Sequence, residues 1–134
     1  MYMTISKTIL CVDDDEDDRF FLCEAIRHLA PALNIVEVAN GIEALTYLQN
    51  IKQQSLPCLV TLDINMPYLD GKQTLEKIKM DASLSALNVI VFTSSENPND
   101  RRFFKNKGVD LYVKPFDNGH LQQIVQNFLS SICV

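Results

Sequence analysis

The sequence predicts an open α/β sandwich, in which helices cover both faces of a parallel β-sheet. Short, β-branched apolar runs alternate with longer amphipathic segments along almost the whole chain. The short runs are almost continuously apolar instead of alternating regularly with polar residues, which is typical of strands buried on both faces. With 134 residues, the chain has room for one well-packed domain and for short connections only.

Five short segments are predicted to be strands, because each is apolar and rich in β-branched residues. In chain order they are Thr8–Val12, Ile35–Ala39, Cys58–Leu62, Val89–Thr93 and Leu111–Val113. An amphipathic segment follows each of them, so the chain consists of five predicted βα units.

The first amphipathic segment, residues Asp17–Ala30, is predicted to be a helix that stops at Pro31. Phe21, Ala25 and Leu29 are spaced four residues apart, which places them on one helical face. We expect this apolar face to pack against the sheet.

The second predicted helix, Asn40–Asn50, begins with Asn40 as its N-cap, and the third spans Gly71–Met80. The fourth follows the capping residue Asn97, has Pro98 in its first turn, where proline is favourable, and ends at Gly108. The last helix begins at Asp117 and is apolar at helical spacing. The residues concerned are Leu121, Ile124, Val125, Phe128, Leu129 and Ile132.

Ionisable and hydroxyl side chains stand where four of the predicted strands end. They are Asp13 and Asp14 after the first strand, Asp63 after the third, Thr93 and Ser94 at the end of the fourth, and Lys114 after the fifth. Ligands of open parallel sheets bind outside the carboxyl ends of the strands, so we expect these residues to share one rim.

The residue types at this rim indicate a magnesium site that handles phosphate. Carboxylates packed closely repel one another unless they share a cation, and oxygen-only ligands favour Mg²⁺. One carboxylate can attack phosphorus and form an acyl phosphate, while Lys114 and Thr93 bind the other oxygens of the transferred group. The remaining acids, residues 15–18, are predicted to form a solvated turn and helix start, where negative charge suits the helix dipole.

Composition argues against several other classes of protein. The net charge is −5, with 12 basic and 17 acidic residues and no Lys/Arg stripe, so we expect no direct contact with nucleic acid. No apolar stretch is long enough to span a bilayer, and the first residues lack a signal-peptide core, so no membrane contact is expected. Four scattered cysteines without a CxxC pair predict reduced thiols in a cytoplasmic protein.

Five motifs occur together in a specific order: VDDD, VANGIEAL, TLDINMPYLDG, VIVFTSS and YVKPF. Through them the chain resembles the receiver domains of bacterial two-component response regulators, from Thr8 to about Leu129. The resemblance implies a flavodoxin-like, doubly wound five-stranded parallel sheet with strand order 2-1-3-4-5. It also implies that residues 1–134 are a single, stand-alone receiver domain, with a core of about residues 8–129 and no output domain.

The resemblance further implies a role for each rim residue. Asp63 would accept a phosphoryl group from a sensor histidine kinase or a phosphotransfer protein. The Mg²⁺ ligands would be Asp14, Asp13 through water, Asp63 and the backbone carbonyl of Asn65; Thr93 and Ser94 would form the switch, and Lys114 would bind phosphate. The expected protein signals through an unknown downstream protein, resets by autodephosphorylation and is not a turnover enzyme.

One position departs from the family pattern. Leu111 stands where the family usually has Tyr or Phe, three residues before the lysine. Tyr112 has the opposite strand parity and cannot replace that aromatic residue. We therefore expect the response to depend more on Thr93 and the loop 94–99. The surface around Arg101 and Arg102, made by the fourth helix, fifth strand and fifth helix, is the predicted site of partner binding or homodimerisation.

Two alternatives from other classes share part of the pattern. A haloacid-dehalogenase-like Mg²⁺ phosphatase also begins with an aspartate pair of the Asp13 and Asp15 spacing, but it needs two acids after the lysine, where only Asp117 follows. A calcium-binding loop would use acids from Asp13 to Glu24, but it requires glycine where Asp18 stands.

Overall fold

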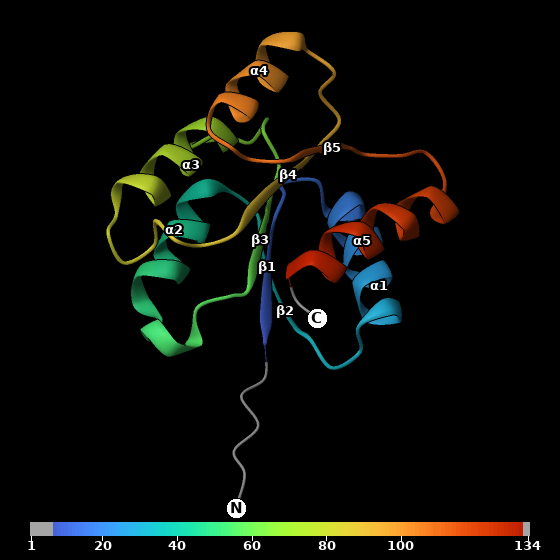
Figure 1. Cartoon of the computed structure of the whole chain (residues 1–134), viewed down its shortest axis with the longest axis horizontal. Coiled ribbons are helices and arrows are strands. Elements are labelled where there is room, and N and C mark those ends of the chain that lie inside the picture. The colour runs from blue at the N-terminus through green and yellow to red at the C-terminus, as the bar shows by residue number, and fades with distance from the viewer. Residues whose placement is uncertain (1–6, 133–134) are drawn as a thin grey trace, which may run out of the picture.

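Five parallel strands form one sheet in the order β2-β1-β3-β4-β5 in the computed structural model, which describes residues 7–132 (Figure 1). This order and the parallel pairing are those predicted. The strands are β1 Thr8–Val12, β2 Asn34–Val38, β3 Leu59–Leu62, β4 Val89–Thr93 and β5 Leu111–Val113. Each bound lies within one residue of its prediction.

Within residues 7–132, five α-helices alternate with the strands. They are α1 Glu16–Leu29, α2 Gly41–Asn50, α3 Gly71–Met80, α4 Pro98–Asn106 and α5 Asn118–Ile132, and a short 3₁₀ turn, η1 Gln53–Ser55, was not predicted. Asn40 and Asn97 cap α2 and α4 with their side chains, as the sequence indicated. No helix in this part of the chain is both long and apolar enough to cross a membrane.

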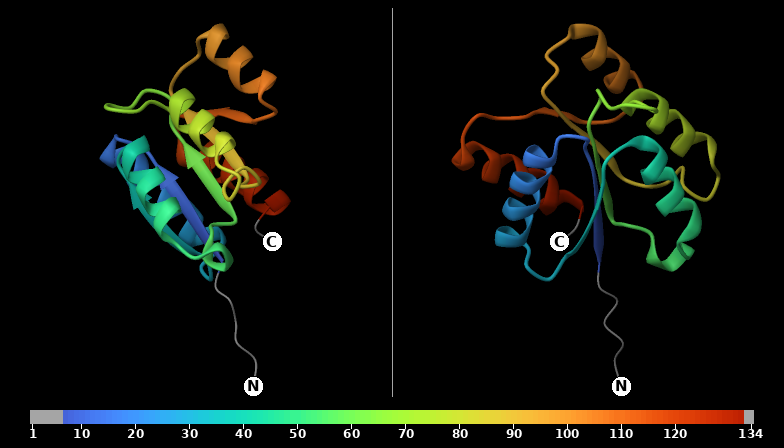
Figure 2. Two further views of the ribbon diagram at one scale, coloured as in Figure 1. Left: turned by 90° about the vertical axis from the view of Figure 1, so that its left-hand side faces the viewer. Right: turned by 180° about the vertical axis from the view of Figure 1, so that it is seen from behind.

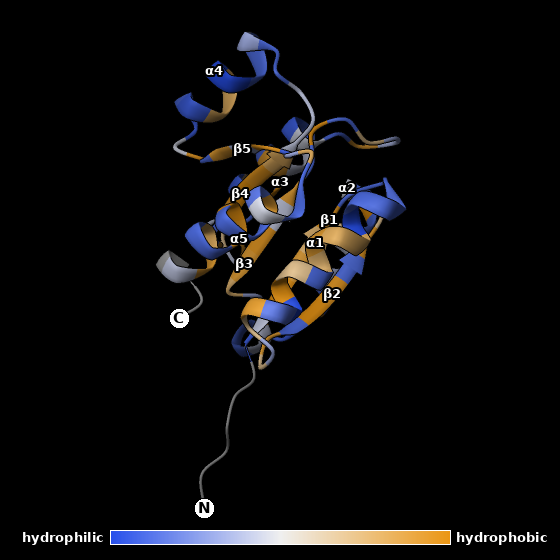
Figure 3. Ribbon diagram, turned by 90° about the vertical axis from the view of Figure 1, so that its right-hand side faces the viewer, coloured by the Kyte–Doolittle hydropathy of each residue, from blue (hydrophilic) through white to orange (hydrophobic). Residues whose placement is uncertain are grey.

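The helices form two layers, one on each face of the sheet. Figure 2 shows α1 and α5 together on one side, with α2 and α3 on the other. The α2 and α3 side also receives Phe104 of α4, which is fully buried there. In Figure 3 the strands β1, β3 and β4 are hydrophobic along most of their length, whereas the helices combine hydrophobic and hydrophilic residues. Burial on both faces therefore explains why these strands are continuously apolar.

The predicted buried face of α1 is confirmed for Ala25 and Leu29, which pack in or against the core, but not for Phe21. Phe21 is 52% exposed, whereas the buried residues of α1 are Leu22, Cys23, Ala25 and Ile26. A spacing of four residues drifts around a helix of 3.6 residues per turn, and Leu22 with Ile26 satisfies the same pattern. Tertiary packing selects the second face and leaves Phe21 at the surface.

The cysteines follow the prediction only in part. Cys11 in β1 and Cys23 in α1 are buried and free. Cys58, by contrast, is disulfide-bonded, so the prediction of a reduced thiol is wrong for this residue. Cys58 lies just before β3, is half-buried and packs against the core on the α1 and α5 side of the sheet.

Candidate functional site

The predicted rim residues meet at the carboxyl edge of the sheet because the backbone ladder brings their strands together. The amide of Asp63 donates to the carbonyl of Val12, 3.0 Å away, which places Asp63 beside Asp13. The amide of Lys114 donates to the carbonyl of Thr93 at 2.8 Å, which continues the same edge across β4 and β5.

Asp63 is a buried carboxylate whose two oxygens have different partners. The residue is 7% exposed. Oδ1 accepts a hydrogen bond of 2.7 Å from the amide of Ile64, and Oδ2 lies 3.2 Å from the ammonium nitrogen of Lys114. These contacts hold both oxygens of the carboxylate in fixed positions.

Lys114 is the centre of an ion-pair network. Its Nζ lies 2.7 Å from Asp13 Oδ2, 2.8 Å from Asp18 Oδ2 and 3.2 Å from Asp63 Oδ2, and its side chain is 10% exposed. Burial acts to lower the pKa of Lys114, but the hydrogen bonds to Asp13 and Asp18 and the charge of Asp63 outweigh it. The pKa is therefore raised, and the ammonium stays charged.

At Asp13, in contrast to Lys114, the effect of burial on the pKa outweighs that of the ion-pair contacts. It is 4% exposed, and burial raises its pKa to about 6, although the hydrogen bond with Lys114 acts against this rise. The nearby charge of Asp63 raises the pKa further. With a pKa of about 6, Asp13 is mostly ionised at pH 7.

A hard cation fits the carboxylate arrangement. Asp13, Asp14 and Asp63 each offer a carboxylate oxygen, and these oxygens lie within 4.8 Å of one another. With Asp18, the site holds four carboxylates, three of which lie on the ammonium of Lys114, so negative charge is in excess there. An all-oxygen donor set of this kind suits Mg²⁺ or Mn²⁺. The side chain of Asn65 is exposed, which is compatible with a role for its backbone carbonyl only.

Gly71 shapes the loop after Asp63. Its amide donates to the carbonyl of Ile64 at 2.7 Å. A Cβ atom at position 71 would lie 2.3 Å from the carbonyl oxygen of Asp63, so no larger residue fits without moving the backbone. The first residue of α3 therefore helps to fix the position of Asp63.

Thr93 lies at the end of β4 and is fully buried. Its hydroxyl oxygen accepts a hydrogen bond of 3.2 Å from the amide of Ser95, while Ser94 between them is exposed. Ser95 donates through its own hydroxyl to Asp100 Oδ2 at 2.6 Å, and Lys72 Nζ lies 2.7 Å from Asp100 Oδ1. A chain of polar contacts therefore runs from the Thr93 hydroxyl through α4 to α3.

Two site residues were not identified from the sequence. The prediction of a solvated turn is wrong for Asp18, because its carboxylate turns back to Lys114. No sequence pattern indicated this contact, because Asp18 lies in α1 and not at the end of a strand. Arg19 donates from Nη1 to the carbonyl of Asp13 at 2.6 Å and pairs through Nε with Glu37 of β2 at 3.0 Å.

The comparison with protein families identifies the chain. The response regulator receiver domain matches residues 9–126, which include every rim residue named above. The chain belongs to this family. Response regulators that carry the domain are signalling proteins, and a phosphoacceptor role in a two-component system fits the carboxylate rim of this member.

Individual relatives and solved structures agree with this assignment. Response regulator Rre1 of Synechocystis sp. is 36% identical over 124 residues, which are 92% of this chain and 52% of Rre1. The chain thus spans about half the length of that relative. The phosphorylated cyanobacterial phytochrome response regulator RcpA is 30% identical and superimposes with a TM-score of 0.82, over 93% of this receiver and 92% of RcpA. The Mn²⁺-bound form of response regulator Rcp1 is 27% identical, with a TM-score of 0.79 and 92% coverage of both chains.

Neither alternative class agrees with the geometry. Asp15 does not enter the site as a phosphatase motif would require; its side chain caps α1 by accepting from the amide of Asp18. Asp117 is exposed and accepts from the amide of His120 at the start of α5. A calcium loop is also incompatible, because α1 begins at Glu16 and holds the remaining candidate acids in a helix.

Proposed function

We propose that Asp63 of this receiver accepts a phosphoryl group from a phosphohistidine of a sensor histidine kinase or a phosphotransfer protein. The observation that carries the proposal is a buried carboxylate at the end of β3 that shares the ammonium of Lys114 with Asp13. Such a group is held in one orientation and lies close to a cation that can bind the oxygens of the transferred group.

The transfer needs a nucleophile and groups that hold the phosphoryl oxygens. A carboxylate oxygen of Asp63 attacks phosphorus and forms the new P–O bond, while the P–N bond to the donor histidine breaks and its electron pair returns to the imidazole. Lys114 supplies a positive charge to the phosphoryl oxygens. Thr93 supplies a hydroxyl donor once its side chain turns from Ser95 to the phosphoryl group.

We propose that Asp13, Asp14, Asp63 and the Asn65 carbonyl hold Mg²⁺. The donor set is made of oxygens, and its spacing is compatible with one shared cation. When bound, Mg²⁺ neutralises charge on the carboxylates and on the phosphoryl oxygens. The Mn²⁺-bound form of Rcp1 supports a divalent cation in a receiver of this type.

The acyl phosphate is the signal in this proposal. Each signalling event phosphorylates the protein once, and hydrolysis of the acyl phosphate resets it, so the protein does not turn over a substrate.

The proposed partner surface is the one around α4 and β5. A groove of about 640 Å³ lies there, and Arg101, Arg102 and Lys105 give it a basic side while Leu111 contributes apolar surface. A downstream protein or a second copy of the chain would bind there.

The proposal is tested by phosphorylation with acetyl phosphate or phosphoramidate and Mg²⁺, followed by intact mass spectrometry. The wild type should gain one phosphoryl group that is stable in acid and removed by base or hydroxylamine. Asp63→Asn should gain none. Asp17→Asn, which removes a carboxylate exposed on α1, is the matched control and should be labelled like the wild type. Full labelling of Asp63→Asn would contradict the assignment.

A further inference from the structure

We propose that Asp18 is a positioning residue that competes with the phosphoryl group for Lys114 and so limits how tightly the site holds that group. This inference rests on the proposed function of Asp63. Asp18 belongs to helix α1, whereas the other residues of the site follow the ends of strands. Its Oδ2 nevertheless lies 2.8 Å from Lys114 Nζ.

The first step of the argument is the number of donors on Lys114. An ammonium group has three N–H donors and no acceptor. Three carboxylate oxygens, from Asp13, Asp18 and Asp63, already lie at 2.7, 2.8 and 3.2 Å from Nζ. A phosphoryl oxygen that binds Lys114 must therefore displace one of these carboxylates.

The second step identifies which carboxylate leaves. The phosphoryl group on Asp63 can take over the contact of that carboxylate with Lys114, so a second phosphoryl oxygen reaches Nζ only in place of Asp13 or Asp18. Asp13 is closed in, with its side chain 5% exposed. The Asp18 side chain is 38% exposed, so water can solvate its carboxylate at the lowest cost of the three. The amide of Asp18 remains bound to Asp15 Oδ1 at 2.9 Å, so the helix start persists when the side chain turns away.

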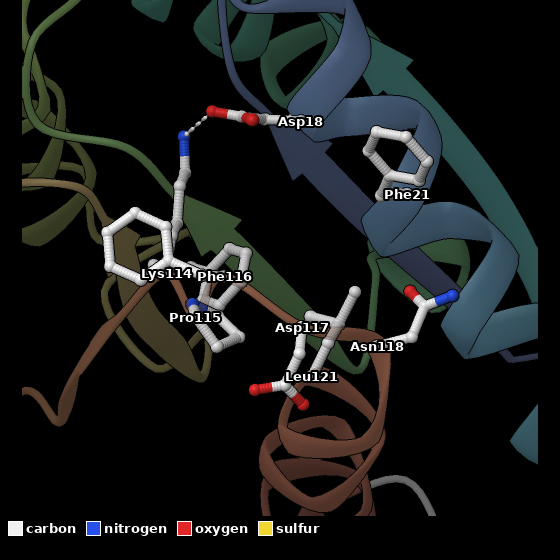
Figure 4. Close-up of a pocket in the computed structure, with 9 residues that line it drawn as sticks. Asp18, Phe21, Lys114, Pro115, Phe116, Asp117, Asn118 and Leu121 are labelled. Atoms are coloured by element: carbon white, nitrogen blue, oxygen red, sulfur yellow. Dashed lines mark hydrogen bonds and ion pairs between the residues drawn. The ribbon is translucent and has the colours of Figure 1, made fainter.

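The surroundings give the displaced carboxylate space to move. Asp18 and Lys114 both line a cavity of about 360 Å³ that Phe21 and Phe116 also line. Figure 4 shows the Asp18 carboxylate reaching the Lys114 ammonium beside this space. Rotation of the Asp18 side chain therefore requires no repacking of the core.

The third step is the charge of the phosphorylated site. A phosphoryl group adds about −1.5 to −2 charges, so Asp18 would face a dianion instead of a single carboxylate. Competition for Lys114 and repulsion from the phosphoryl group act in the same direction. Both favour the unphosphorylated receiver, and both are removed by the substitution Asp18→Asn.

Beryllofluoride, a phosphoryl mimic, tests the inference at saturating Mg²⁺, with binding followed by ¹⁹F NMR. Asp18→Asn should bind the mimic about three- to tenfold more tightly than the wild type, as expected for loss of one partly exposed ionic hydrogen bond. Asp17→Asn removes the same charge from the same turn without a contact to Lys114. It should change the affinity by less than about twofold, because solvent screens an exposed charge.

Two further variants make the outcome unambiguous. Asp18→Glu restores the carboxylate and should bind the mimic as weakly as the wild type, whereas binding as tight as that of Asp18→Asn would overturn the inference. Thermal unfolding of Asp18→Asn checks that the variant is folded. If the wild type binds no mimic, or if Asp63→Asn binds it equally well, the proposed function fails. The other case is that the wild type binds beryllofluoride and Asp63→Asn does not. If Asp18→Asn then binds the mimic no more tightly than Asp17→Asn, only the role of Asp18 is refuted.

Discussion

Leu111 and Tyr112 are neighbours in β5 and lie on opposite faces of the sheet. Leu111 pairs with Val91 and packs against the cluster on the α2 and α3 side. Tyr112 packs on the α1 and α5 side, where its ring centre lies 5.9 Å from that of Phe128. The position at which the family carries an inward-turning aromatic residue is thus occupied by a half-buried leucine, and Tyr112 cannot replace it.

The first prediction ranks Thr93 above Leu111 in the conformational response. The Thr93 hydroxyl connects through Ser95 to Asp100, so its movement alters contacts that hold the start of α4. Leu111 has a smaller side chain than the Tyr or Phe usual in the family, and it has no hydroxyl. Its inward and outward side-chain positions should therefore differ less in free energy than those of the aromatic residue. With beryllofluoride, Thr93→Ala should lose the amide chemical-shift changes in α4 and β5, and Leu111→Ala should keep them. The reverse pattern would contradict this order.

The second prediction separates phosphorylation from signalling at Lys114. Lys114→Ala should still gain some phosphate on Asp63. It should lack the accompanying conformational change, because no ammonium group is present to bind the phosphoryl oxygens. Without Mg²⁺, this variant leaves three carboxylates facing one another. Its free energy of unfolding should therefore fall by roughly 2–4 kcal/mol, with part of the loss recovered in Mg²⁺. Lys77→Ala, at an exposed position of α3, is the control for the loss of a lysine. A normal conformational response in Lys114→Ala would remove this residue from the switch.

The third prediction concerns pH and follows from the raised pKa of Asp13, which is about 6. Between the pKa of an unfolded aspartate, near 4, and pH 6, the folded protein binds more protons than the unfolded chain. The free energy of unfolding in EDTA should therefore decrease as the pH rises through this window. Mg²⁺ requires the ionised carboxylate, so its affinity should fall as the pH drops below about 6.

Asp13→Asn provides the control for that titration. The variant has no charge to bury, so without metal it should be more stable than the wild type at pH 7 by on the order of 1–3 kcal/mol. The difference should disappear near pH 4. Equal pH dependence of unfolding in the two proteins, measured by denaturant titration, would show that Asp13 does not titrate in this window.

The fourth prediction compares two glycines. Gly71→Ala should lower the free energy of unfolding by about 1–3 kcal/mol and should reduce phosphorylation, because the added Cβ meets the Asp63 carbonyl. At Gly119 in α5, an added Cβ would lie 3.5 Å from the nearest atom, Asp117 Oδ1, which is an ordinary contact. Gly119→Ala should therefore leave stability unchanged or raise it by up to about 1 kcal/mol. Equal effects of the two substitutions would argue against the close contact at Gly71.

The elements and the rim of the site could be predicted from the sequence because both depend on local patterns. Continuous apolar runs indicate buried parallel strands, and the carboxyl ends of such strands meet at one edge, so Asp13, Asp63 and Lys114 follow from their place in the chain. The orientation of α1 depends instead on packing against α5. That packing exposes Phe21 and turns Asp18 toward Lys114, and neither result is determined by the residues of α1 alone.

Arg19 joins the loop that carries Asp13 to Glu37 in β2, an outermost strand of the sheet. Edge strands generally open more readily than central ones, and hydrogen exchange of their amides reports such local unfolding. Because one guanidinium holds both segments, opening of β2 should release the Asp13 loop as well. A cation bound at the rim would then slow amide exchange in residues 34–38, so the far edge of the sheet becomes a remote reporter of site occupancy.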